Sequence, residues 1–273
     1  MKKLVLFTFV LTFVVASYAQ DTDSTSTNRE SRRERKETRR KRIAELSRQA
    51  EEGILIYSKQ SIFGLQLKTN GYGAFYELGK MKSNRKTNIY RIDITETKEH
   101  KEEKLLTNNF FGNSFIYGKI NYFYPVTIGL GQQYIFGQKG NKNGVAVSGI
   151  YNVGLSLGLL RPYYIEVRDG SNEAKTIKYN PDDSASSALF LSESSIIGGG
   201  GFGKGWSEIK VKPGAFAKIA MRFDYGRFNE SVNGLEIGVS AEYYGSKIPI
   251  MLFQKDRNLF LQAYIAILFG KRK

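Results

Sequence analysis

The chain has 273 residues, a formal net charge of +15 and no cysteine, which excludes disulfide bonds and a lipid anchor on a cysteine. Aromatic residues make up 13% of the chain and there are 28 glycines, a composition that favours a β-protein with tight turns. Beyond the N-terminus no segment approaches the roughly 18 apolar residues that mark a membrane-spanning helix, so a helical membrane protein is excluded too.

Residues 1–19 have the pattern of a secretory signal peptide. Lys2 and Lys3 form a basic start, Leu4–Val15 is apolar, and Ala19 ends a small-residue cleavage site. We predict cleavage after Ala19. An N-terminal anchor helix is the weaker alternative, because a span needs about 20 apolar residues and this run is shorter.

Residues 20–53 are predicted to form a basic periplasmic arm. The polar spacer Asp21–Asn28 is followed by ten Arg or Lys residues against four acids between Arg29 and Arg48. This part lacks Pro and Gly, and its Glu-to-Arg or Glu-to-Lys pairs at i,i+4 spacing favour a solvated helix. It is either a plain spacer, helical or disordered, or an electrostatic arm for an anionic periplasmic protein or surface. A nucleic-acid partner is not expected for an exported chain. The candidate partner-binding residues are Arg32, Arg33, Arg35, Lys36, Arg39, Arg40, Lys41 and Arg42.

Residues 54–273 are dominated by alternation of apolar and other residues. A period of two indicates β-strands with one apolar face. The connections alternate between short and long, with Pro125 and Arg161–Pro162 as predicted short turns and Gln138–Gly144 in the long set. The ten candidate strands are Ser61–Lys68, Tyr72–Leu78, Asn88–Glu96, Phe110–Tyr124, Val126–Phe136, Val145–Leu159, Tyr163–Arg168, Ala215–Phe228, Gly234–Tyr244 and Leu259–Phe269.

This pattern predicts an all-β fold, a transmembrane antiparallel up-and-down β-barrel in outer-membrane lipid, with about 10 strands and a range of roughly 8–12. A soluble barrel would place its apolar face inside, around a ligand. Here the face opposite the apolar one carries glycines and charges of both signs, which favours the membrane. The predicted lumen charges are Lys218, Arg222, Asp224, Glu236 and Glu242.

The sequence offers little for catalysis or for cofactor and metal binding. The run Gly198–Gly205 lacks the Ser or Thr that a phosphate-binding loop requires after its lysine. The one histidine, His100, lies in a charged stretch that reads as a solvated loop. We therefore predict no catalytic residue, no metal site and no cofactor.

Several stretches resemble an uncharacterised family of Bacteroidota-type outer-membrane β-barrel proteins. The resemblance covers residues from about Phe110 to Lys273 and leaves out the basic arm. It implies a barrel in the cell outer membrane and brings no known activity, so no functional residue carries over. The stretches that carry it are Phe110–Pro125, Gly158–Tyr164, Gly198–Trp206, Arg222–Asn229 and Lys247–Met251.

The expected function is that of a non-enzymatic outer-membrane barrel. It would act as a scaffold or partner in an envelope assembly, docked through the basic arm. The alternative is a conduit for small solutes or lipid that uses the charged lumen.

Overall fold

The computed structural model describes residues 34–41, 44, 57–106, 113–140, 144–169, 173–226 and 230–273. Two units, residues 1–52 and 53–273, are distinguished. In the first, residues 34–41 form a helix with exposed side chains. The predicted signal peptide and the rest of the arm, Ala44 apart, lie outside the described residues. No helix in the described part of the chain is long and apolar enough to cross a membrane.

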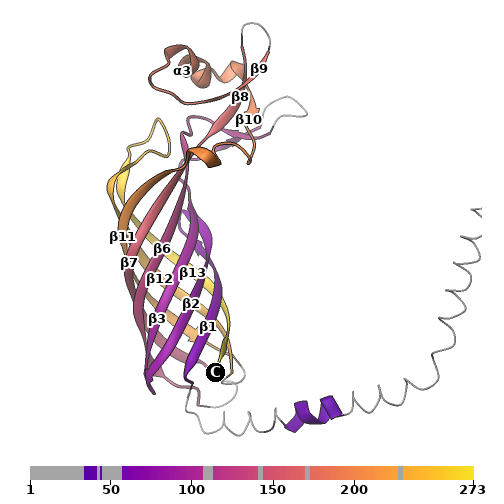
Figure 1. The fold of residues 1–273 in the computed structure, drawn as a ribbon, viewed down its shortest axis with the longest axis vertical. Coiled ribbons are helices and arrows are strands. Elements are labelled where there is room, and N and C mark those ends of the chain that lie inside the picture. Colours follow the sequence, from indigo (N-terminus) through magenta and orange to yellow (C-terminus); the bar gives the residue numbers. More distant parts are fainter. Residues whose placement is uncertain are drawn as a thin grey trace, which may run out of the picture. The chain divides into compact units, whose positions relative to one another are not determined.

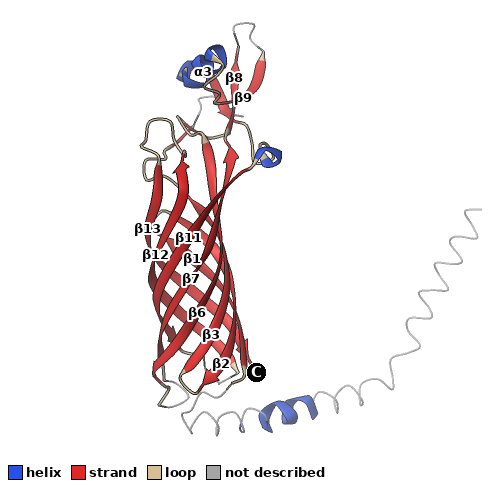
Figure 2. Ribbon diagram, turned by 60° about the vertical axis from the view of Figure 1, so that its left-hand side comes forward, coloured by secondary structure: helices blue, strands red, loops and turns tan. Residues whose placement is uncertain are grey.

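Eight antiparallel strands close into an up-and-down barrel (Figures 1 and 2). Closure comes from β1 and β13, which pair from Gln60↔Arg272 to Lys68↔Tyr264. The predicted fold class is confirmed, and eight strands lie at the lower limit of the predicted range. The barrel strands are β1 (Lys59–Lys68), β2 (Gly71–Ser83), β3 (Lys86–Thr97), β6 (Asn121–Gly137), β7 (Ala146–Pro162), β11 (Lys210–Asp224), β12 (Ser231–Ile248) and β13 (Arg257–Arg272).

The preferred count of ten strands was wrong because two prolines were interpreted as turns. Pro125 lies inside β6, where it pairs with Gly158 of β7. On the other side of β6, the ladder with β3 passes from Ile94↔Val126 to Thr97↔Phe123 and skips Pro125, whose carbonyl accepts instead from the Thr95 hydroxyl at 3.3 Å. A proline has no N–H to donate and is tolerated at such a gap.

The second predicted turn, at Arg161–Pro162, is the end of β7. The chain then runs on into β8 (Tyr164–Arg168), which pairs with β9 and β10 and with no barrel strand. Residues predicted to return through the membrane therefore extend the structure beyond it. The alternation of Tyr163–Arg168 was identified correctly, but alternation does not say which sheet a strand joins.

Side chains alternate between the barrel interior and its outer surface, as the sequence predicts. Even-numbered positions point inward on β1, β7, β11, β12 and β13, and odd-numbered positions on β2, β3 and β6. Glycines on the inner face make room for rings. A Cβ on Gly64 would lie 2.3 Å from the Phe75 ring, and one on Gly129 would lie 2.5 Å from the Phe216 ring.

Short and long connections lie at opposite ends of the barrel (Figure 1). One end carries the connections 84–85, 138–145 and 225–230. The first and last residues of the barrel sequence lie at the same end, where Ser58 N–H donates to the carbonyl of Lys273 at 2.7 Å. The other end carries connections 69–70, 98–120, 163–209 and 249–256. Gln138–Gly144 therefore belongs with the short connections, contrary to the prediction. We call the two ends the short-turn end and the long-loop end.

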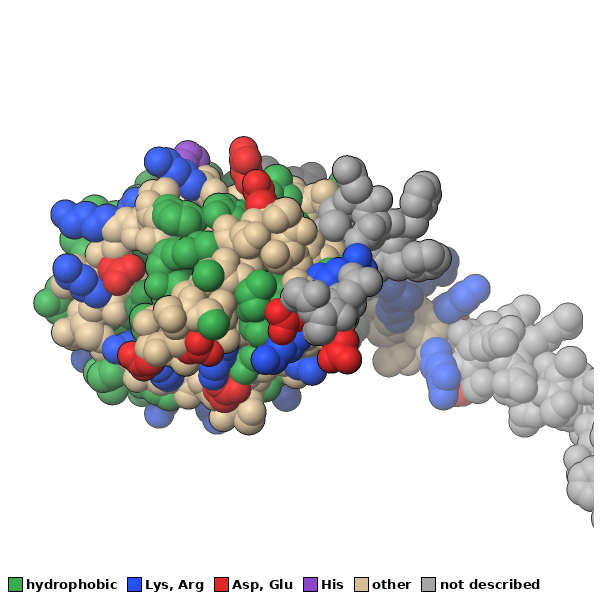
Figure 3. Space-filling model, turned by 90° about the horizontal axis from the view of Figure 1, so that it is seen from above, with side chains coloured by type: hydrophobic (Ala, Val, Ile, Leu, Met, Phe, Trp, Pro, Cys, Tyr) green, Lys and Arg blue, Asp and Glu red, His purple; other side chains and the backbone are tan. Residues whose placement is uncertain are grey.

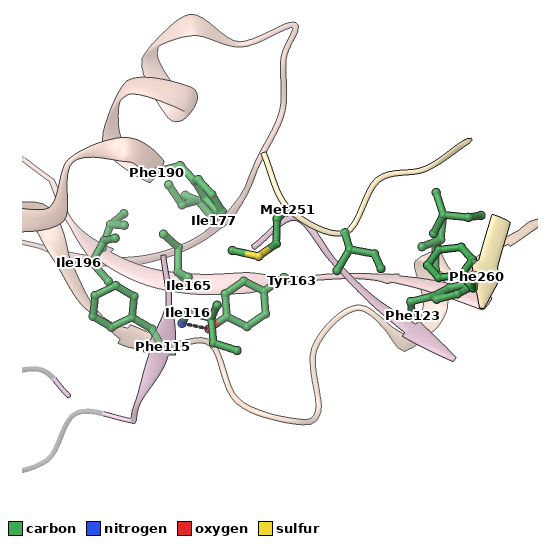
Figure 4. Packing of buried hydrophobic residues seen from close by; sticks show 14 of the residues in the cluster. Phe115, Ile116, Phe123, Tyr163, Ile165, Ile177, Phe190, Ile196, Met251 and Phe260 are labelled. Carbon is green, nitrogen blue, oxygen red and sulfur yellow. Dashed lines mark hydrogen bonds between the residues drawn. The ribbon is translucent and has the colours of Figure 1, made fainter. Parts of the chain in front are cut away.

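The apolar core of the barrel mouth, which includes Phe123 and Phe260, continues into a small cap formed by the long loops (Figures 1 and 4). Side chains from three loops meet there, including Phe115, Ile165, Phe190 and Met251. The Tyr163 hydroxyl accepts a 2.9 Å hydrogen bond from the Ile116 N–H and ties two of these loops together. The cap elements are β4 (Lys104–Leu105), β5 (Phe115–Ile116), β8, β9 (Ala174–Lys178), α3 (Ser184–Leu191), η1 (Glu193–Ser195), β10 (Ile196–Gly199) and η2 (Trp206–Glu208).

The cap was the main feature that sequence reasoning missed, because no helix or strand was predicted between Tyr163–Arg168 and Ala215–Phe228. The helix α3 has the Asp183 carboxylate as N-cap, which accepts from the N–H groups of Ala185 and Ser186. Seen from above, acidic and basic side chains stand side by side among apolar ones at this end (Figure 3).

Candidate functional site

The middle of the barrel interior is filled by an ionic network with equal numbers of cations and carboxylates. Each member of the network is buried, with side-chain exposure of 3% or less. The eight groups come from β1, β2, β3, β11 and β12: Lys68, Glu77, Arg91, Asp93, Lys218, Arg222, Glu236 and Glu242.

Arg222 is the centre of this network. Its guanidinium donates to both oxygens of Glu77 at 2.8 and 2.7 Å, and to Glu236 Oε2 at 2.6 and 3.0 Å. The second arginine, Arg91, binds the other oxygen of Glu236 at 2.7 Å and reaches Asp93 at 3.2 Å. Forked contacts of this kind are strong because both partners are charged and the geometry is fixed. The two arginines thus link β2, β3, β11 and β12 across the lumen.

Two lysines complete the network toward the long-loop end. Lys218 donates to Asp93 at 2.8 Å, and Lys68 donates to Glu242 at 2.9 Å. The carboxylates also accept from neutral groups, since Tyr264 OH donates to Glu236 at 2.7 Å. Buried charges that are paired and hydrogen-bonded in this way are stable, whereas unpaired ones are costly.

All five predicted lumen residues are buried in the interior, and four of them belong to the network. The fifth, Asp224, lies nearer the short-turn end, 2.7 Å from Arg272 and 3.3 Å from Lys139. Tyr57 covers this group, with the Arg272 guanidinium 4.9 Å from its ring.

The partners Lys68, Glu77, Arg91 and Asp93 were not among the predicted site residues. They occupy the non-apolar register of the first three predicted strands, and that signal was available in the sequence. Which charges meet across the lumen depends on strand pairing, which the sequence pattern leaves undefined.

Aromatic rings fill the interior between the ionic network and the long-loop end. Phe123, Tyr244 and Phe260 are buried, with ring centroids 5.3 to 5.9 Å apart. With the ionic network in the middle and the Asp224 group at the short-turn end, the lumen is obstructed at three levels. The geometry supports a plugged barrel rather than an open pore.

The outer surface of the barrel is an apolar belt. Ile219, Val239 and Leu261 on neighbouring strands are 67, 59 and 72% exposed. Exposed aromatic residues lie near both ends, such as Tyr72 and Tyr243 at one and Phe136 and Phe269 at the other. A closed barrel with an apolar belt between aromatic girdles and a polar interior is built for an outer membrane, and that is where this chain resides.

Other predicted features are placed as follows. In the basic arm, Arg35, Lys36, Arg39, Arg40 and Lys41 are exposed on the helix of residues 34–41. The remaining predicted arm residues, Arg32, Arg33 and Arg42, lie outside the described residues.

His100 is exposed in a loop. Among the described residues, no three His, Cys, Asp or Glu side chains are grouped to hold a metal ion.

The glycine-rich run Gly198–Gly205 is followed by the three-residue 3-10 helix η2 and not by the α-helix that a phosphate-binding loop requires. Gly198 and Gly199 form part of β10, and a Cβ on Gly198 would lie 2.6 Å from the carbonyl oxygen of Asn113. Gly201 and Gly205 have positive φ angles of 81° and 84°. These glycines serve close packing and turns in the cap.

No protein-family model matches the chain, and no curated protein is detectably similar to it. The resemblance to a Bacteroidota-type family therefore stays a prediction. Weakly similar solved structures include three bacterial proteins. Neisserial surface protein A has 10% identity and a TM-score of 0.36 over 79% of this chain and 96% of its own. The N-terminal β-barrel domain of Pseudomonas aeruginosa OprF has 9% identity and a TM-score of 0.35, over 78% of this chain and 98% of its own. Ail, the attachment invasion locus protein of Yersinia pestis, has 9% identity and a TM-score of 0.33, over 79% of this chain and 99% of its own.

Proposed function

We propose that this protein is a closed, non-enzymatic outer-membrane barrel that acts as a scaffold or partner in an envelope assembly. The sealed lumen is the observation that carries this proposal. The ionic network balances its own charges, and its two central arginines, Arg222 and Arg91, are each at most 1% exposed. A barrel whose interior is committed to its own structure acts through its ends.

The short-turn end is the side on which the chain enters β1, and in outer-membrane barrels short turns are periplasmic. The arm that precedes β1 then works in the periplasm. Its exposed cations on residues 34–41 support docking onto an anionic protein or lipid surface.

The purified barrel is expected to show no steady conductance in planar bilayers. Opening a path requires the Arg222 and Arg91 contacts to break, and buried ion pairs of this geometry are costly to separate. The measurement is single-channel recording of the full chain at several voltages. Steady, voltage-independent channels in the unaltered protein would contradict the closed-barrel proposal.

A conduit for small solutes or lipid is the second candidate. Buried polar atoms of Asn152, Ser240 and Gln262 have no hydrogen-bond partner among the described protein groups. Water can satisfy such groups, so parts of the lumen are suited to hold water. The conductance experiment separates the two proposals.

Deleting residues Thr22–Glu52 is expected to leave the barrel folded and to abolish capture of its partner from membranes. Replacing Arg39→Glu together with Arg40→Glu is expected to remove most of the capture. Binding by exposed cations weakens as salt rises, because screening acts over about 8–10 Å at 0.10–0.15 M salt. The measurement is affinity capture of the full chain and its variants over a salt series.

The matched control is Lys82→Glu with Arg85→Glu, two exposed cations at the short-turn end of the barrel. This pair carries the same change in charge and is expected to retain capture. If the deletion captures the same partner with the same salt dependence, the arm is a tether and the scaffold proposal through the arm is lost.

A further inference from the structure

A cavity of about 410 Å³ opens at the long-loop end, between the tips of β2, β3, β6 and β7 and the loop that carries β4. Tyr72, Lys98, Lys104 and Tyr122 line it together with Arg161. A second cavity, of about 320 Å³, shares Tyr122 and Phe202 with the first and is bordered by the backbone of residues 199–201. The volume of the first lies within the range of about 300–1,000 Å³ common for small-molecule sites.

Arg161 gives this cavity a buried cation that forms no ion pair with a described carboxylate. Its side chain belongs to a residue that is 1% exposed, and its guanidinium lies 4.2 Å from the ring of Tyr122 and 4.5 Å from that of Trp206. Nη1 donates to the carbonyl of Phe202 at 2.9 Å, while Nε has no hydrogen-bond partner among the described groups. Buried charges are ordinarily paired, and aromatic rings compensate an arginine only in part.

The other charges around the cavity leave a positive excess. Lys119 is buried and paired with Glu102 at 2.6 Å, and burial lowers the pKa of its ammonium group while Glu102 opposes that shift. Lys98 and Lys104 form no ion pair with a described residue, although Lys98 lies 5.0 Å from the Tyr72 ring. The described lining thus holds four cations, Lys98, Lys104, Lys119 and Arg161, against two carboxylates, Glu96 and Glu102.

We propose that this cavity binds a sugar that carries a phosphate or carboxylate group. The anion would be held by Lys98, Lys104 and Arg161, since charge-assisted hydrogen bonds to phosphate and carboxylate are strong. Tyrosine rings around the cavity offer flat apolar surfaces with polar edges, which suit the apolar face and the hydroxyls of a sugar ring.

Trp206 can report on ligand binding by its fluorescence, because it is the chain's one tryptophan and its ring lies 4.5 Å from the Arg161 guanidinium. Its ring is stacked on Tyr124, with centroids 6.0 Å apart. Glucose 6-phosphate and glucuronate, titrated against the full chain in zwitterionic detergent, are expected to change Trp206 fluorescence saturably. Glucose, and NaCl at matched ionic strength, are expected to leave it unchanged. Absence of a saturable response to every anionic probe, or an equal response to glucose, overturns the proposal.

Lys98→Ala with Lys104→Ala is expected to weaken binding of glucose 6-phosphate by about tenfold or more, which corresponds to losing about 1.4 kcal/mol of binding free energy. These two lysines sit at the rim, so the variant is expected to fold, as heat-modifiable gel migration would show. The matched control is Lys175→Ala with Lys255→Ala, two exposed cap lysines outside the cavity lining. Equal weakening by both pairs would show a general charge effect and would refute the site.

The sugar could be soluble or part of a glycolipid headgroup in the same membrane. The full chain is therefore also placed in phosphatidylcholine vesicles with and without lipid A, a phosphorylated disaccharide glycolipid. A Trp206 response to lipid A that is lost in Lys98→Ala with Lys104→Ala identifies the headgroup as ligand. A response to the soluble sugars alone identifies a soluble ligand. Both results support the anionic-sugar site.

Discussion

Arg222→Ala is expected to destabilise the barrel by about 3–5 kcal/mol, the cost of removing one partner from a buried ion pair. The substitution would leave Glu77 and Glu236 facing each other across the lumen, with Arg91 3.6 Å from Glu77 and 2.7 Å from Glu236. Neither carboxylate has access to solvent, because both side chains are fully buried. The measurement is urea unfolding in vesicles, with the folded fraction followed by heat-modifiable gel migration.

Arg257→Ala is the matched control for that experiment. Arg257 pairs with Glu99 at 3.1 Å, but its side chain is 60% exposed. Exposed pairs are worth about 0–1 kcal/mol, so this loss is expected to be small. Arg222→Lys is expected to fall between the two, because a lysine keeps the charge and loses the forked contact. Equal losses for Arg222→Ala and Arg257→Ala would show that the lumen network does not hold the barrel together.

The sequence predicted the barrel well because the membrane imposes a simple rule on every strand. Ile219, Val239 and Leu261 all had to be apolar to face lipid, and alternation then placed Lys218, Arg222, Glu236 and Glu242 inside. Local pattern was sufficient for this result. It required no knowledge of which strands are neighbours.

The errors came from features that depend on pairing between distant residues. Pro125 is accommodated at a gap in the β3–β6 ladder, which no local pattern shows. The Arg222–Glu77 contact joins residues 145 positions apart in the chain. The cap core likewise gathers Phe115, Phe190 and Met251 from separate loops, so its residues looked like isolated apolar positions. For the same reason Arg161, predicted to lie in a turn, was not recognised as a buried cation.

Ile219→Arg is expected to destabilise the inserted barrel by about 2–4 kcal/mol, the cost of placing an arginine near the middle of the lipid-facing surface. Ile219 lies well inside β11, is 67% exposed, and is flanked in register by Tyr151 and Val239, both of which are exposed. An arginine there has apolar neighbours on both sides and no carboxylate to pair with among them. The same urea titration in phosphatidylcholine vesicles measures the effect.

Val211→Arg makes a nearly identical change at the long-loop end of the same strand. Val211 is 55% exposed, close to the value for Ile219, but it is the second residue of β11. Near the interface an arginine side chain can reach water, and the cost falls to about 0–1 kcal/mol. The expected result is therefore a loss of stability that depends on depth rather than on exposure. If both variants lose the same small amount, as they would on a water-facing sheet, the apolar belt does not face lipid and the barrel does not span a membrane.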